Sequence, residues 1–392
     1  MRVAIYAHDF VPEHGGGYTY EQEILEAVAA TRKTARHDLC VVGHASDPPR
    51  GWEDGTYLSV YENRGRRIVG QLRRRARATA HPRRRPRSRL DEAFVATGAD
   101  LVWCLGGATP TYELPYVATV WDLQHRRQPI FPEVATKGIW EQRERDLSRD
   151  IGQAAVVVVG TDAGRAEVEG FYGVLPERIR KLPHPTPSFA MDPTPSDDGI
   201  LAEYGLAPGF LFYPAQFWAH KNHVILLHAL RLLRDDHDLE LQAVFVGSDK
   251  GNEQHVRRTA QTLDVERQVH FLGFVPRPHL VALYRNAFAL GYMSFFGPEN
   301  LPPLEAFALG CPVVASNVPG AEEQLGEAAL LVPPTSETVL AAALLSLQRN
   351  PELRHRLIER GHARARSFTA ADYVEGMMGV LDELQPVIRT WR

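Results

Sequence analysis

The stretch Phe295–Ser316 reads FFGPENLPPLEAFALGCPVVAS and contains a turn, a helix start and a buried strand. Gly297 and Pro298 break regular structure, because glycine tolerates unusual φ values and proline fixes its own. Asn300 can cap a helix, and the prolines at 302 and 303 fit a first turn, where N–H groups lack intrahelical partners. Gly310 ends the helix, and the run PVVA that follows predicts a short buried strand.

This helix start has the features of an anion site. A helix that begins after a glycine-bearing loop presents backbone N–H groups and the positive end of its dipole to an anion. Glu305 lies one turn into the helix, where a phosphate alone has no use for a carboxylate. A ligand with both phosphate and hydroxyl groups, such as a nucleotide sugar, would use both. An ordinary helix with a surface glutamate is the alternative, because helix-start signals are common.

Size and composition indicate a globular protein of two domains. The chain has 392 residues, of which 44% are hydrophobic and 23% charged. No apolar run has the length of a bilayer span, and the first residues, MRVAIY, resemble a strand more than a signal peptide. The three cysteines, Cys40, Cys104 and Cys311, are widely spaced and form no metal pair. We therefore expect a reduced, cytoplasmic location and apolar core roles for the thiols.

An arginine run dominates the charge pattern. Twelve arginines and no acidic residue lie between Arg64 and Arg89, so an overall charge of −4 leaves −16 for the rest (−4 minus 12). Residues 68–79 could form a basic helix on the inner face of a membrane or beside an anionic acceptor. A solvated loop is the alternative. Nucleic acid is not expected, because the run lacks aromatic residues for base stacking.

Short apolar runs alternate with helical patterns through the whole chain, which predicts parallel sheets in two α/β halves. In the first half the expected strands are Val3–His8, Leu39–Gly43, Asp100–Leu105, Tyr116–Val120 and Ala155–Gly160, with a helix at Tyr18–Thr31. In the second half they are Phe210–Pro214, Leu241–Gly247, Val269–Leu272, Phe288–Met293 and Ala329–Val332, with helices at His223–Arg234, Gln254–Leu263 and Pro278–Asn286. A polar, proline-rich segment, Pro183–Asp198, resembles a linker. A cleft between the halves is the expected site, because ligands bind at the carboxyl ends of such strands.

Two loops at predicted strand ends could meet a ligand in that cleft. Gly15, Gly16 and Gly17 follow the first strand and let the backbone approach a ligand closely. They do not form GxGxxG, and no acid ends the second strand, so a nicotinamide site is disfavoured. Lys221 lies between a strand and a helix start, where the dipole disfavours a cation unless it serves a ligand such as a diphosphate.

Other polar residues are expected to be structural. Asp236-His237-Asp238 has the spelling of a metal-binding Asp-x-Asp, but it precedes a strand, away from the carboxyl ends where ligands bind. We expect a solvated turn there and no metal. His184 near the linker and His270 inside a strand are also expected to be structural.

The order of these motifs resembles family 4 of the GT-B glycosyltransferases, which belong to glycosyltransferase group 1. The segments that carry the resemblance are Gly15–Gly17, His220-Lys221-Asn222, Val244–Gly247, Phe271–Phe274 and Asn300–Glu305. The resemblance implies two Rossmann-like domains that face each other across a cleft. It places an acceptor domain at 1–185, a nucleotide-sugar domain at 186–368, and a C-terminal helix at 369–392 that packs back on the first domain.

The resemblance also implies roles for individual residues. The implied donor-binding residues are Gly15, Gly16, Gly17, Gln216, Lys221, Gly247, Phe274, Glu299, Asn300, Leu301 and Glu305. Lys221 would bind the diphosphate, and Glu305 would hold the ribose hydroxyls. Gly247 and Phe274 would line the nucleoside pocket, and backbone N–H groups of Asn300 and Leu301 would face sugar or phosphate. Asp122, His125 and Lys221 would act in catalysis.

The chain departs from the family pattern at three places. Gly297 stands where a glutamate is frequent, and Glu299 is a displaced substitute. Gln216 stands where an arginine is frequent. A frequent His-Asp pair appears as Trp121-Asp122, and His125 could take over the role of that histidine.

The expected reaction is metal-independent hexosyl transfer with retention, without a cofactor, in the synthesis of a polysaccharide or related glycan. The donor would be GDP-mannose or a UDP- or dTDP-sugar. The acceptor would be a glycan, a lipid-linked sugar or a small molecule. The alternatives are a non-catalytic sugar-nucleotide-binding protein and a nucleotide-sugar epimerase.

Overall fold

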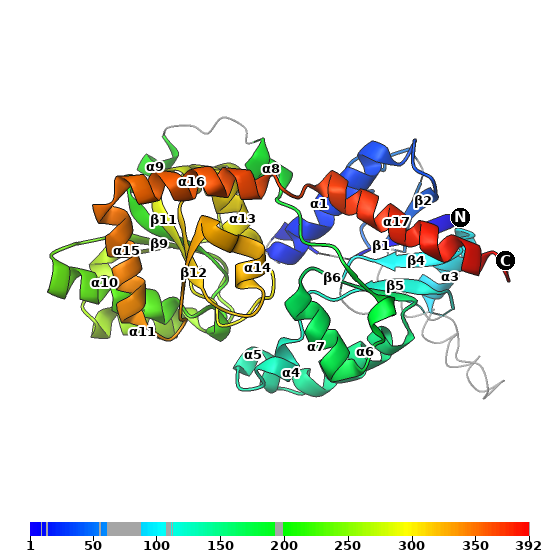
Figure 1. The fold of residues 1–392 in the computed structure, drawn as a ribbon, viewed down its shortest axis with the longest axis horizontal. Helices are drawn as coiled ribbons and strands as arrows, with labels where there is room; N and C mark the ends of the chain where they lie inside the picture. The colour runs from blue at the N-terminus through cyan, green and yellow to red at the C-terminus, as the bar shows by residue number, and fades with distance from the viewer. Residues whose placement is uncertain are drawn as a thin grey trace.

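The structure is a computed structural model that describes residues 1–8, 10–12, 15–54, 56–60, 88–106, 111, 113–192 and 199–391 (Figure 1). The predicted basic helix at 68–79 therefore lies outside the described residues, as does the run from Arg64 up to residue 87.

The first half is built on a parallel sheet of seven strands in the order β3-β2-β1-β4-β5-β6-β7. The strands are β1 (Arg2–Ala7), β2 (Asp38–Gly43), β3 (Tyr57–Ser59), β4 (Leu101–Cys104), β5 (Tyr116–Thr119), β6 (Val156–Val159) and β7 (Ile179–Lys181). Its helices are α1 (Gly16–Thr31), α3 (Arg89–Ala96), α4 (Gln124–Arg127), α5 (Pro132–Ala135), α6 (Ile139–Gln153) and α7 (Asp162–Tyr172), with a 3-10 turn at Pro176–Arg178. The central strands are mostly apolar and buried because both faces of the sheet are covered.

The second half repeats this architecture with six parallel strands in the order β10-β9-β8-β11-β12-β13. The strands are β8 (Phe210–Pro214), β9 (Ala243–Val246), β10 (Val269–Gly273), β11 (Ala287–Tyr292), β12 (Val313–Ser316) and β13 (Ala329–Val332). Its helices are α8 (Ser188–Met191), α9 (Ile200–Glu203), α10 (His223–His237), α11 (Glu253–Thr262), α12 (Arg277–Asn286), α13 (Leu301–Ala308), α14 (Ala321–Leu325), α15 (Glu337–Arg349) and α16 (Pro351–Ala365). Short 3-10 turns lie at Ala219–Lys221, Glu266–Gln268 and Gly326–Ala328.

Both sheets reverse their strand order at a central point, between β1 and β4 in the first half and between β8 and β11 in the second. Such a switch point opens a crevice outside the carboxyl ends of the strands, where open α/β sheets bind ligands. The prediction of two Rossmann-like α/β domains is confirmed. The sequence did not predict β3 at one edge of the first sheet, which is short and has two exposed residues.

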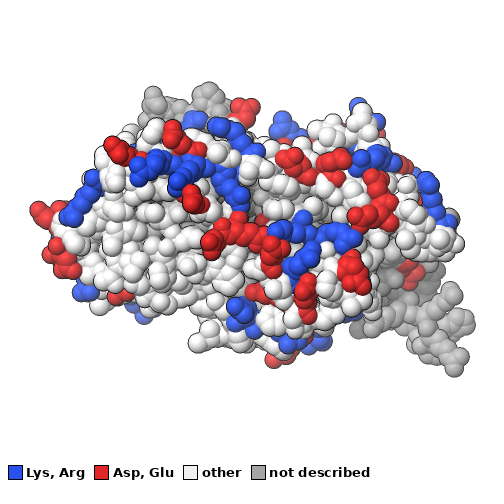
Figure 2. Space-filling model, viewed as in Figure 1, with Lys and Arg blue, Asp and Glu red and all other residues white. Residues whose placement is uncertain are grey.

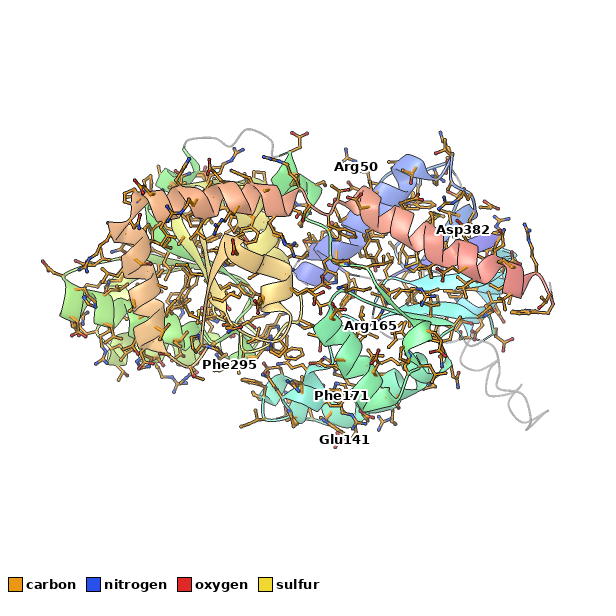
Figure 3. All side chains as sticks on the ribbon, in the orientation of Figure 1. Arg50, Glu141, Arg165, Phe171, Phe295 and Asp382 are labelled. Carbon is orange, nitrogen blue, oxygen red and sulfur yellow. The ribbon has the colours of Figure 1, made fainter. Side chains whose placement is uncertain are left out.

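The last helix, α17 (Ala370–Ile388), returns to the first half and lies alongside α1 (Figure 1). It buries seven side chains: Tyr373, Val374, Met377, Met378, Val380, Leu381 and Ile388. These share one core with β1 and α1, and Tyr20 on α1 donates a hydrogen bond of 2.6 Å to the hydroxyl of Tyr373. Asp382, labelled on α17 in Figure 3, accepts from Arg36 at 2.9 Å. The chain thus passes between the two halves twice.

The prediction of a turn at Asp236–Asp238 is only partly correct, because Asp236 and His237 are the last residues of α10 and Asp238 is its C-cap. Asp238 has a positive φ of 49°, and none of these three residues lines the cavity between the halves. Across the described part of the chain, no cluster of three or more His, Cys, Asp or Glu side chains is arranged to hold a metal ion.

Candidate functional site

A cavity of about 780 Å³ lies between the two halves, at the carboxyl ends of both sheets. Its volume is in the range of small-molecule sites in proteins. The residues predicted to bind a donor all line it: Gly15, Gly16, Gly17, Gln216, Lys221, Gly247, Phe274, Glu299, Asn300, Leu301 and Glu305. Asp122 lines it as well, and His125 does not.

Lys221 is held on the second-half wall by a chain of hydrogen bonds. It ends the 3-10 turn after β8, and Asn222 follows in the left-handed region with a φ of 56°. The Lys221 ammonium donates to the hydroxyl of Tyr292 at 2.9 Å, and that hydroxyl donates to Oδ1 of Asn300 at 2.7 Å. Tyr292 ends β11 and was not predicted, because it looks like an ordinary strand residue. The chain places a fixed cation beside the start of α13.

The start of α13 is shaped by Asn300 in a way that the sequence did not predict. Asn300 is the N-cap residue, but its side chain makes no capping hydrogen bond and donates instead to the carbonyl of Gly297 at 2.9 Å. Gly297 has a φ of 134°, and a Cβ there would lie 2.5 Å from Oδ1 of Asn300. The positive φ and this close contact would strain any side chain at position 297, which disfavours the frequent glutamate in this loop. The Asn300 N–H donates to Oε1 of Gln324 at 3.0 Å and prolines follow at 302 and 303, so Leu301 supplies the N–H group that this first turn can offer to a ligand.

Glu305 is a buried carboxyl group one turn into α13. Its Oε2 accepts a hydrogen bond of 2.7 Å from the hydroxyl of Tyr284. Burial raises the pKa of Glu305 to about 7, although Tyr284 and Arg277 oppose that rise. The group therefore lies close to its titration point near neutral pH and is placed to bind hydroxyl groups.

The rest of the second-half wall requires a glycine where two loops meet. Gly247, after β9, has a φ of 151°, and a Cβ there would lie 2.4 Å from the carbonyl oxygen of Ala215. Next to it, Gln216 accepts a hydrogen bond of 2.9 Å from the indole of Trp218. Phe274, after β10, is 51% exposed and offers an open ring to the cavity. This part of the wall suits a ligand with a flat ring, which could pack on Phe274 with its edge against the backbone of Gly247.

On the first-half wall, the glycine segment lies against the second half. A Cβ on Gly15 would lie 3.7 Å from Nε2 of Gln216, and one on Gly16 would lie 4.0 Å from Leu301. Gly15 has a φ of 71° and precedes α1. The backbone of this segment therefore reaches the opposite wall, and the close approach to a ligand that its glycines predict stays a prediction.

Asp122 follows β5 and carries an ionised carboxylate. Its Oδ1 accepts hydrogen bonds from the Gln124 N–H at 2.9 Å and from Arg143 at 2.6 Å. Burial would raise the pKa of Asp122, but Arg143 and the Gln124 N–H outweigh it and hold that pKa below its usual value. The side chain is 35% exposed, so it remains available to a ligand.

His125 faces away from the cavity, so the structure removes it from the candidate site. Its imidazole is fully buried, with Nε2 at 3.2 Å from Oε2 of Glu144 and 3.2 Å from the hydroxyl of Tyr172. Burial lowers the pKa of His125. The single turn α4 directs this side chain into the packing against α6 and α7. It is a structural residue.

Glu299 lines the cavity but is bound to the first half. Its Oε1 accepts from the backbone N–H of His184 at 2.7 Å, and a Cβ on Gly160 would lie 1.2 Å from its Oε2. Burial raises the pKa of Glu299 to about 8. His184, which was expected to be only structural, also lines the cavity, and burial lowers its pKa to about 4, so the ring is neutral. Neither contact had a local signal in the sequence.

Polar contacts join the halves around the cavity. His220 donates its backbone N–H to Oε1 of Glu133 on α5 at 2.9 Å, and its Nδ1 lies 2.5 Å from the same oxygen. Gln128 donates to the carbonyl of Phe295 at 2.9 Å, and Figure 3 shows Phe295 on the side of the second half that faces α4 and α5. Lys181 of β7 pairs with Glu323 of α14 at 2.7 Å. The two walls are therefore held close together.

On the face drawn in Figure 2, acidic and basic side chains are interspersed along α16 and across the junction of the halves. The described residues on this face thus mix both signs. Within the described ranges, no helix is both long enough and apolar enough to cross a bilayer.

Comparison with protein families finds one match. Residues 205–364 match the model of the family described as "Glycosyl transferases group 1". That segment includes Lys221 and the whole of α13, and it ends within α16.

Two curated relatives are moderately similar. One is "O-antigen chain mannosyltransferase B" from Escherichia coli, 27% identical over 61% of this chain and 63% of that protein. Another is "D-inositol 3-phosphate glycosyltransferase" from Corynebacterium efficiens, 28% identical over 66% of this chain and 63% of that protein. The chain thus spans just under two thirds of the length of these relatives.

Solved structures match along almost the whole chain. Sucrose-phosphate synthase from Thermosynechococcus elongatus aligns with a TM-score of 0.72 and 18% identity, covering 99% of this chain and all of that one. Anabaena Alr3699/HepE, solved with UDP and glucose, aligns with a TM-score of 0.70 and 18% identity over 98% of this chain and all of that one. These likenesses confirm the predicted GT-B fold.

Proposed function

We propose that this chain is a group 1 glycosyl transferase that moves a sugar from a nucleoside-diphosphate sugar to an acceptor hydroxyl. One observation carries the proposal: the Lys221 ammonium, the start of α13 and the Glu305 carboxyl line the same wall of one cavity. This wall offers a cation for a diphosphate and a carboxyl group for ribose hydroxyls. The family match over residues 205–364 and the transferase names of the relatives support it.

In this proposal the protein stabilises the departing diphosphate. The bond between the sugar and the diphosphate weakens first, and positive charge develops on the sugar. Lys221 and the N–H group of Leu301 at the start of α13 face the negative charge that develops on the leaving group. The acceptor hydroxyl attacks on the same face with retention, and a diphosphate oxygen takes its proton. Asp122 holds hydroxyls of the acceptor or sugar, and no protein nucleophile, metal or cofactor is required.

The donor and the acceptor are proposed at the level of classes. GDP-mannose, or a UDP- or dTDP-sugar, would be the donor, and the mannosyltransferase name of one relative favours mannose. The acceptor would be a glycan, a lipid-linked sugar or a small molecule. We further infer a cytoplasmic enzyme of glycan synthesis. Peripheral membrane contact through Arg64–Arg89 stays a prediction, because nearly all of that run lies outside the described residues.

The departures Gly297 and Gln216 favour one other function, a non-catalytic protein that binds a sugar nucleotide. Gly297 is explained by the position of Asn300, and Glu299 brings a carboxyl group to the same cavity. We therefore prefer the transferase. An epimerase remains the third candidate, and turnover separates all three. Released nucleoside diphosphate supports a transferase, isomerised donor an epimerase, and binding without turnover a binding protein.

The first experiment is a thermal-shift screen against GDP-, UDP- and dTDP-sugars, because a ligand that binds the native state raises the melting temperature. The best donor is then titrated by calorimetry into wild type, Lys221→Ala and Glu305→Ala. We expect each variant to weaken binding at least tenfold. Lys33→Ala, at an exposed lysine beyond the end of α1, is the control and should bind like wild type. Wild-type affinity in both site variants would refute the donor assignment.

A further inference from the structure

We propose that the first-half wall of the cavity is a subsite for an uncharged sugar ring of the acceptor, which packs on Trp121 and donates hydroxyl hydrogen bonds to Asp122. This inference rests on the proposed function, since it names the acceptor class for the same site. The donor assignment does not depend on it.

Trp121 is a fixed aromatic surface in the cavity wall. Its indole N–H donates to the carbonyl of Leu105 at 3.1 Å, which sets the orientation of the ring. Two glycines make room for that ring. A Cβ on Gly17 would lie 3.2 Å from it, and a Cβ on Gly106 would lie 2.3 Å from it. Tyr20 packs edge-on at 5.6 Å between ring centroids. The indole is therefore held in place without a ligand.

The neighbouring groups match the two kinds of surface that a sugar presents. A pyranose has C–H faces, which pack on aromatic rings, and hydroxyl groups, which need hydrogen-bond partners. Tyr18 lines the cavity as well and is partly exposed, whereas Tyr20 is buried and supports the Trp121 ring from the core. Asp122 follows Trp121 directly and is ionised. Among the described residues, both hydrogen bonds to its side chain use Oδ1, and a carboxylate has acceptor sites on both oxygens.

The charges on the two walls differ. Lys221 and Arg277 are the lysine and arginine residues that line the cavity in the described part of the chain, and both belong to the second half. Arg143 is paired with Asp122 and does not line the cavity. A phosphate on the acceptor would therefore lie near the Asp122 carboxylate, and the described residues of that wall offer no lysine or arginine to pair with it. Burying an unpaired charge beside a like charge is costly, so the wall favours an uncharged ring.

The position of this wall indicates the acceptor rather than the nucleotide. Lys221 and Glu305, which the proposed function assigns to the diphosphate and the ribose, project from the second half. Trp121 and Asp122 follow β5 in the first half, and the glycine segment Gly15–Gly17 lies next to them. A second substrate would therefore meet the donor from the Trp121 side.

The test uses the full-length protein with the donor that binds best. Matched acceptors are the octyl glycosides of mannose, glucose, galactose and N-acetylglucosamine, and, as phosphorylated acceptors, mannose 1-phosphate, glucose 6-phosphate and myo-inositol 1-phosphate. We expect at least one neutral glycoside to raise release of nucleoside diphosphate at least tenfold above the rate in water, and the phosphorylated acceptors to raise it less than twofold. Acceleration by a phosphorylated acceptor, or by no neutral glycoside, overturns the inference. Absence of donor binding would instead refute the proposed function.

Substitutions of two tryptophans, one on each wall, then test the two walls independently. Trp121→Ala should raise the KM for the neutral acceptor at least tenfold and leave the donor dissociation constant within twofold of wild type. Trp218→Ala, at a tryptophan on the opposite wall, should show the reverse pattern. Trp121→Phe keeps an aromatic ring and should give an intermediate KM, which guards against a fold defect in the alanine variant. An acceptor KM within twofold of wild type in either folded Trp121 variant overturns the stacking role.

Discussion

The two walls of the cavity are built by different means. On the second-half wall, polar groups from separate strand ends fix one another, as in the chain from Lys221 through Tyr292 to Asn300. On the first-half wall, aromatic rings and glycines shape the surface, and Asp122 adds an ionised carboxylate. The first half also holds residues 61–87 and 107–110, which lie outside the described ranges. This difference fits the proposed roles of the two walls. The second-half wall would hold the donor in one geometry, and the first-half wall would bind an acceptor, whose surface can vary.

The halves also differ in how far each completes its own core. The core of the second half is formed by residues between Ala190 and Ala365. One core of the first half includes α17 and Leu301, both from later in the chain. The second half should therefore be self-sufficient, and the first half should depend on the C-terminus.

Removal of residues 370–392 should have the largest effect on stability, and it should unfold the first half while the second half stays folded. The deletion takes seven buried side chains from the first core. At about 1.5–3 kcal/mol for each side chain, the loss is about 10–20 kcal/mol, which exceeds the usual stability of a domain. Hydrogen exchange should show the first half exchanging freely while β8–β13 stay protected. Equal protection of both halves would contradict this dependence.

The second largest effect should be a decrease in the free energy of unfolding as the pH rises. Burial raises the pKa of Glu305 to about 7 and of Glu299 to about 8, from an ordinary value of 4.5. Since the folded state binds more protons, the stability from these groups is complete below pH 4.5 and is lost as pH rises through 7 and 8. Thermal melts between pH 5 and 9 should show this fall, and Glu299→Gln should reduce it. Glu352→Gln, at a glutamate that is 90% exposed, should leave it unchanged.

Gly160→Ala tests whether Glu299 links the two walls of the cavity. The new methyl group would occupy the position of the Glu299 carboxyl, 1.2 Å from Oε2. Loss of the hydrogen bond to the His184 N–H should cost about 1–3 kcal/mol and lower the melting temperature. Gly170→Ala is the matched control, because a methyl group there meets no atom within 4 Å. If both variants melt like wild type, Glu299 does not hold the halves together.

Tyr292→Phe should have the smallest effect and tests the hydrogen-bonded wall alone. Removing the hydroxyl leaves Lys221 without its acceptor and Asn300 without its donor, and one net hydrogen bond is worth about 1 kcal/mol. Affinity for the nucleoside diphosphate, measured by calorimetry, should fall about five- to tenfold. Tyr204→Phe removes a hydroxyl that contacts His279 outside the cavity and should have no effect. An unchanged affinity in Tyr292→Phe would show that Lys221 is positioned by other contacts.

The sequence predicted the strands and the second-half wall well because their signals are local. Lys221, Gly247 and Glu305 stand at fixed offsets from apolar strands, so the strand pattern alone brings them to one sheet edge. Contacts between residues far apart in the chain had no such signal. Gly160 and Glu299 meet across the halves, and Tyr292 is hidden within an apolar strand.

His125 shows why closeness in sequence was misleading. It lies three residues after Asp122, and that spacing suggested a shared site. The single turn of α4 sends the imidazole toward Glu144 and Tyr172 instead. The carboxylate of Asp122 lies in the cavity wall, whereas the His125 imidazole lies behind it and supports the packing of α4 against α6.

The return of α17 to the first half also sets an order of events during synthesis. Domains generally fold from the N-terminus as the chain emerges from the ribosome. Here the helix that covers β1 and α1 follows the whole second half in the chain, so the first half completes its core only after the second half has been synthesised. Until then its apolar surface has no partner, and nascent chains that stall before residue 370 would present that surface to chaperones.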